Sequence, residues 1–155
     1  MKFLYSGDRG QTGHKERVDI IGTPAQLRAI GTFLTTVTKN TAFKGHTGVT
    51  GSYPINLAAL KIMLANSPDA KLEMTVPKDA LTLTAGKDVF RLLGESILAS
   101  FKTGDVSDYE IVVTGIKNSP IMDNPRRDLY FRSEMAQSTT ISEDFSGNNS
   151  GRAYR

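Results

Sequence analysis

The chain has 155 residues, a formal net charge of +3 and no cysteine. This length suits one domain with a core of its own, and the lack of cysteine excludes disulfides, thiolate metal sites and cysteine nucleophiles. The apolar runs are too short for a membrane span or a signal peptide, so we expect a cytoplasmic protein that does not engage a membrane.

Two strands and a helix are predicted at the start of the chain. Lys2–Ser6 and Glu16–Ile21 are rich in apolar and β-branched residues, which is typical of strands. Thr23 and Pro24 then begin a helix, because a threonine hydroxyl caps a free amide and proline lacks the amide that would stay unpaired there. The apolar residues that follow share one helical face: Leu27, Ile30, Leu34 and Val37.

A second helix is predicted to begin at Pro54. Three leucines follow at helical spacing, and the sequence Ser-Pro-Asp at 67–69 ends the pattern. These leucines are Leu57, Leu60 and Leu64.

A hairpin and a third helix come next. Residues 72–76 and 81–83 alternate apolar and polar side chains on either side of the turn sequence PKDA, which indicates a β-hairpin. The third helix covers Lys87–Phe101, because apolar residues recur there on one face.

The C-terminal part is predicted to hold two strands and a tail. Tyr109–Ile116 contains three consecutive apolar residues, which indicates a strand buried on both faces, and Asp128–Arg132 is predicted as an edge strand. The chain beyond has little to bury. We therefore expect one domain over residues 1–136 and a flexible polar tail over residues 137–155.

An internal repeat emerges when the chain is shifted by 63 residues against itself. Each copy has a strand, a small turn and a helix that carries Arg-x-[Ile/Leu]-Gly. Glycine costs about 1 kcal/mol relative to alanine inside a helix, so glycines at equivalent places indicate a close approach to the sheet or to the other helix. A chance likeness of two amphipathic units is the alternative. The matched residues are Val18, Ile20, Leu27, Arg28, Ile30, Gly31 and Leu34 with Leu81, Leu83, Phe90, Arg91, Leu93, Gly94 and Ile97.

The predicted fold class is α+β. We expect a mostly antiparallel sheet that is covered on one face by about three helices. If the repeat is real, two similar strand–strand–helix halves form the domain around a pseudo-two-fold axis.

Two glycine-rich loops are the main functional candidates: GDRGQTGH at residues 7–14 and GHTGVTGS at residues 45–52. Glycine lets backbone amides approach phosphate oxygens, and a helix start behind the loop adds a favourable dipole. The second loop precedes the helix predicted at Pro54. Neither loop matches the known nucleotide fingerprints, and a mobile connection is the alternative for each. The predicted ligand-binding residues are Arg9, His14, Lys15, Lys44, His46, Thr47, Thr50 and Ser52.

The two histidines define a catalytic alternative. A duplicated strand–strand–helix protein with two histidines resembles the two-histidine phosphoesterases, in which each half supplies a His-x-Thr/Ser motif and the imidazoles act as acid and base. Here the strings are His14-Lys15-Glu16 and His46-Thr47-Gly48, without a hydroxyl two residues after either histidine. The histidines are also 32 residues apart and not 63, so the chain is assigned to no family.

A basic aromatic segment, NPRRDLYFR, covers residues 124–132. Arginine forks bind phosphate and aromatic faces stack on bases. The alternative is a strand that turns Leu129 and Phe131 to the core. Acidic neighbours such as Asp128 dilute the positive charge, so nucleic acid is a disfavoured partner.

The sequence therefore favours a non-catalytic binding protein for a small anionic, phosphate-bearing ligand, such as a nucleotide signal that it would sequester. A protein-binding inhibitor or immunity-type protein is one alternative, and a phosphodiester-cleaving enzyme that uses the two histidines is the other. No catalytic residue, metal site or cofactor is predicted. The expected partner is a small anion or another protein, and a homo-oligomer is compatible with the chain.

Overall fold

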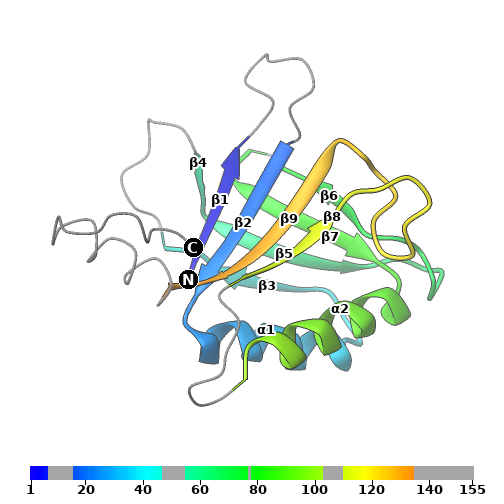
Figure 1. Cartoon of the computed structure of the whole chain (residues 1–155), viewed down its shortest axis with the longest axis horizontal. Helices are drawn as coiled ribbons and strands as arrows, with labels where there is room; N and C mark the ends of the chain where they lie inside the picture. The colour runs from blue at the N-terminus through cyan, green and yellow to red at the C-terminus, as the bar shows by residue number, and fades with distance from the viewer. Residues whose placement is uncertain (7–15, 47–54, 77, 103–109, 135–155) are drawn as a thin grey trace, which may run out of the picture.

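The computed structural model describes residues 1–6, 16–46, 55–76, 78–102 and 110–134 (Figure 1). The tail predicted at 137–155 lies outside these ranges. The elements in chain order are β1 (Lys2–Ser6), β2 (Glu16–Gly22), α1 (Pro24–Thr35), β3 (Thr41–Lys44), β4 (Ile55–Leu57), β5 (Ala59–Leu64), β6 (Glu73–Thr75), β7 (Ala80–Ala85), α2 (Lys87–Ser100), β8 (Glu110–Thr114) and β9 (Arg127–Ser133).

The strands form two sheets, so the α+β class is confirmed and the single sheet is wrong. The first sheet has the order β4-β1-β2-β9-β8 and the second has the order β3-β5-β7-β6. Both are mixed, because β2 is parallel to β9 and β5 is parallel to β7, while the other pairs are antiparallel. In Figure 1 the helices lie side by side along one side of the two sheets. One cluster of buried side chains joins both sheets and both helices.

The helix predicted at Pro54 is wrong, and the structure has β4 and β5 in that region. Leu60 and Ile62 are buried in β5 while Lys61 and Met63 are exposed, which is the period of two expected of a strand. The parallel pairing of β5 with β7 places Leu60 beside Leu81, and this long-range contact overrides the local helical spacing of the leucines.

The two C-terminal strands have exchanged the roles predicted for them. β9 lies between β2 and β8, so it is an interior strand, whereas β8 ends the first sheet. Val112 of β8 is 41% exposed, so the prediction of burial on both faces is wrong. The reason is the parallel pairing of β9 with β2, which joins segments more than 100 residues apart and leaves no local pattern.

The predicted start of α1 is confirmed in detail. The Thr23 hydroxyl accepts a hydrogen bond from the amide of Gln26 at 3.1 Å, and the Gln26 side chain accepts one from the Thr23 amide at 3.0 Å. This reciprocal capping box satisfies two amides that the helix itself leaves unpaired, and Pro24 occupies the first turn.

Two hairpin–helix units are present, β1-β2-α1 and β6-β7-α2. Each hairpin is extended by strands that follow the helix of the other unit, since β2 pairs with β9 and β7 pairs with β5. The units are therefore interlocked, and each sheet contains strands from both parts of the chain.

The glycines at equivalent places in the two units face each other where the helices cross. A Cβ atom on Gly94 would lie 2.5 Å from the carbonyl oxygen of Gly31 and 2.9 Å from the backbone nitrogen of Thr35. A Cβ on Gly31 would lie 3.2 Å from the carbonyl oxygen of Gly94. The close approach predicted from the sequence is thus made to the other helix.

We expect Gly94→Ala to lower the free energy of unfolding by about 1–3 kcal/mol, because the new methyl group meets backbone atoms that cannot rotate away. The higher helix propensity of alanine would by itself have the opposite effect and raise the free energy of unfolding by about 1 kcal/mol. The matched control is Ser96→Ala on the exposed face of α2, which should change stability by less than about 0.5 kcal/mol. Urea denaturation measures both variants, and a Gly94→Ala protein as stable as wild type would contradict the tight crossing.

Candidate functional site

Most of the predicted ligand-binding residues cannot be placed, since they fall within the segments that the structure does not describe. Lys44 and His46 are described, and both side chains are exposed. The residues outside the described ranges are Arg9, His14, Lys15, Thr47, Thr50 and Ser52.

Backbone contacts fix the described start of the second loop. The amide of Gly45 donates to the carbonyl of Ala58 at 2.7 Å, and the amide of His46 donates to the carbonyl of Met1 at 2.7 Å. A Cβ on Gly45 would lie 2.7 Å from the Leu57 carbonyl oxygen, so this glycine permits a close contact between chain segments. His46 is therefore held beside Met1, and Lys44 is held beside Ala59 of β5.

The second loop leads into β4, so the helix dipole expected behind it is absent from the described chain. The strand register provides a different relation between the two loops. Ile55, the first described residue after the second loop, pairs with Tyr5, and the first loop leaves β1 one residue later, after Ser6. The described ends of the two loops are therefore neighbours on adjacent strands.

An arginine–aspartate cluster lies on the face of the first sheet opposite the core. Asp19 of β2 has a side chain that is only 7% exposed. Arg17 donates to both of its carboxylate oxygens, from Nε at 2.6 Å and from Nη2 at 2.8 Å. Arg132 of β9 donates to Asp19 from Nη1 at 3.0 Å, and its Nε lies 3.3 Å from a carboxylate oxygen of Glu110.

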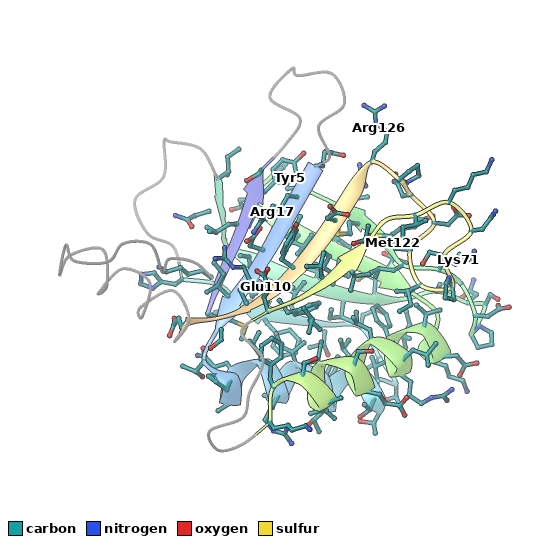
Figure 2. The ribbon with its side chains drawn as sticks, viewed as in Figure 1. Tyr5, Arg17, Lys71, Glu110, Met122 and Arg126 are labelled. Atoms are coloured by element: carbon teal, nitrogen blue, oxygen red, sulfur yellow. The ribbon has the colours of Figure 1, made fainter. Side chains whose placement is uncertain are left out.

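Further contacts hold the Arg17 guanidinium in place. Its central carbon lies 3.6 Å from the centre of the Tyr130 ring, a cation–π contact. The hydrogen bonds to Asp19 raise the pKa of Arg17, so the group carries its charge at any physiological pH. Figure 2 shows Arg17 near the end of the β1–β2 hairpin where the first loop begins.

A cavity of about 250 Å³ opens over this cluster, lined by Leu4, Ser6, Arg17, Asp19 and Arg132. Its described lining has two positive charges and one negative charge. Asp19 accepts hydrogen bonds from two nitrogens of Arg17 and one nitrogen of Arg132. These bonds fix the orientation of both guanidinium groups, including the N–H groups that do not contact Asp19. Guanidinium N–H groups form charge-assisted hydrogen bonds with carboxylates and phosphates.

Sequence reasoning identified part of this site. Arg132 and Tyr130 belong to the basic aromatic segment, which was considered as a phosphate-binding element. Arg17 and Asp19 were missed, although their spacing of two on a strand places both on one face. Their contact with Arg132 depends on the parallel pairing of β2 with β9.

A second polar cluster lies on the opposite face of the same hairpin, between the two sheets. The hydroxyl of Tyr5 donates to Glu16 at 2.6 Å, and Nε of Arg127 donates to the other Glu16 oxygen at 2.8 Å. Nη1 of Arg127 also donates to the carbonyl of Met74 in the second sheet. Cavities of about 190 and 260 Å³ both border Arg127.

Glu16 is ionised in this setting. Partial burial acts to raise its pKa, but the hydrogen bonds from Tyr5 and Arg127 and the positive charge of Arg127 outweigh it, so the pKa lies below its ordinary value of 4.5. The carboxylate therefore serves as a fixed acceptor that links the hairpin to β9.

Comparison with protein-family models, curated proteins and solved structures gave no match. Across the described residues, no helix has the length and apolar character to cross a membrane. Within the same ranges no three His, Asp or Glu side chains gather as a set of metal ligands. Because His14 is outside those ranges, the two-histidine alternative stays a prediction.

Acidification should weaken the Tyr5–Glu16–Arg127 cluster. The folded pKa of Glu16 is lowered, so its stabilising effect is present above pH 4.5 and is lost as the pH falls through the folded pKa. Glu16→Gln should cost about 1 kcal/mol or less at pH 7, because the site is partly solvated. The difference in unfolding free energy between wild type and Glu16→Gln, measured from pH 7 downward, should shrink below pH 4.5. A difference that does not depend on pH would show that the Glu16 charge contributes nothing.

Proposed function

We propose that this chain is a non-catalytic binding protein for a small phosphate-bearing anion. The cavity over Arg17, Asp19 and Arg132 is the core of the proposed site, and the two glycine-rich loops are proposed as further contributors. The observation that carries the proposal is the pair of guanidinium groups fixed by one buried carboxylate within that cavity. Sequestration of a nucleotide signal is one use of such a protein.

Preorganisation supports this proposal. An exposed arginine loses rotamer freedom when it binds a ligand, and this opposes affinity by about 0.5–1.5 kcal/mol for each immobilised side chain. Arg17 is already held by Asp19 and Tyr130, and Arg132 is held by Asp19 and Glu110. Both arginines can therefore receive an anion with little further ordering.

The position of the cavity supports a contribution from the loops. Ser6 lines the cavity and is also the last described residue before the first loop. Ile55 marks the end of the second loop on the neighbouring strand, beside Tyr5. A ligand over Arg17 would thus lie near the described ends of both loops on the first sheet.

Binding is favoured over turnover by the chemistry of the described lining. The carboxylate in the cavity, Asp19, accepts hydrogen bonds from two arginines, so both of its oxygens are already engaged. Arginine guanidiniums do not exchange protons near neutral pH. These groups hold charge in place, and that suits capture of an anion.

Thermal denaturation with inorganic phosphate and with mono-, di- and cyclic nucleotides tests the proposal. A ligand at about 100 times its dissociation constant contributes roughly 2.7 kcal/mol, which corresponds to a rise in Tm of about 5–10 °C for a chain of this size. If no member of the panel shifts Tm, the proposal is wrong, and a protein partner recovered from the native host would favour the inhibitor alternative.

Two substitutions locate the site. Arg132→Lys keeps the charge and loses the planar fork, so it should reduce the ligand-induced shift in Tm. Lys44→Ala should also reduce this shift if the second loop contributes to the site. Arg91→Lys is the matched control, because Arg91 lies on the exposed face of α2 and pairs with Asp88. A shift that Arg132→Lys leaves intact would place the ligand elsewhere.

A further inference from the structure

The outer edge of β8 is unpaired among the described strands, since β8 ends the first sheet. The amide of Gly115 donates to the carbonyl of Arg127 in β9 at 2.8 Å, which fixes the alternation along β8. The backbone groups that point away from β9 are therefore those of Glu110, Val112 and Thr114.

The side chains along this edge include exposed apolar groups. Val112 is 41% exposed and Ile116, just beyond the strand, is 57% exposed. An unpaired edge with apolar side chains is a template for another strand, and natural proteins usually block it with charge or proline. Here Glu110 is the one charged residue of the strand, and proline does not occur in it.

We infer that β8 pairs with β8 of a second copy of this chain, in antiparallel orientation, to form a homodimer with a continuous sheet of ten strands. The two-fold axis passes through Val112, so that Val112 faces its counterpart and Glu110 faces Thr114 of the other copy. All three outward-pointing residues then exchange backbone hydrogen bonds.

Two features select this register. At one end the edge is already closed, because the amide of Ile116 donates to the carbonyl of Met122 at 3.2 Å, so the partner strand cannot slide past Thr114. At the other end, a shift that paired Glu110 with its counterpart would bring two carboxylates face to face, which is destabilising. The register centred on Val112 avoids both conflicts and uses every open backbone group.

Proline at Val112 tests the inference sharply. The amide of Val112 points to the open edge, so Val112→Pro removes no hydrogen bond to β9 and the protomer should stay folded. The same change removes the central amide of the dimer and adds a ring at the contact. We expect wild type to sediment as a dimer and Val112→Pro as a monomer with native circular dichroism. Val112→Thr, which keeps the amide and the β-branched shape, is the matched control and should remain a dimer.

Two charge variants at one position give an independent measurement. Thr114→Lys places a positive charge opposite Glu110 of the other copy, twice per dimer, and should tighten the dimer dissociation constant by several-fold, up to about tenfold. Thr114→Glu should weaken it by a similar factor. A wild-type monomer at the highest concentration accessible to sedimentation, or a dimer that neither Val112→Pro nor Thr114→Glu weakens, would overturn the inference.

Discussion

The crossing of α1 and α2 at two glycines is the constraint on which the rest of the structure depends. Without side chains at Gly31 and Gly94, the helix backbones come into direct contact, as the Cβ distances show. Arg28 reinforces the crossing, because its Nη1 donates to the carbonyls of Leu98 and Phe101 at the end of α2. A bulkier contact would force the helices apart and separate the hairpins that precede them.

The first sheet links the helix crossing to the candidate site through β2 and β9. β2 leads directly into α1, and β9 lies beside β2 with Ile21 paired to Arg132. The position of Arg132 over Asp19 is thus set by pairing between strands that come from different parts of the chain. A buried carboxylate that holds two arginines adds little to stability in general, because desolvation opposes the attraction between the charges. Its clearest effect here is to give both guanidiniums one defined orientation.

The elements that could be predicted from the sequence are those determined by neighbouring residues or by a repeated pattern. The Thr23 cap, the hairpin of β6 and β7, and the glycines in the two helices all depend on neighbouring residues or on a repeated pattern, and these predictions are confirmed. The segment after Pro54 fitted both a helical and an alternating pattern, and only its pairing with β7 decides for strands. The arginine–aspartate cluster was not predicted, because Arg132 lies 113 residues from Asp19. No local sequence pattern indicates the parallel pairing of β2 with β9 that brings the two residues together.

The position of β9 in the chain determines when the first sheet can be completed during synthesis. β9 is the last strand of the described chain, yet it lies between β2 and β8 and is not at the edge of the first sheet. A growing chain on the ribosome therefore keeps β2 incomplete, with Asp19 and Arg17 lacking their third partner, until almost all of the described residues have been synthesised. Sheets closed by such distant segments form slowly. The cavity over Arg17, Asp19 and Arg132 would thus form late, when β9 pairs with β2.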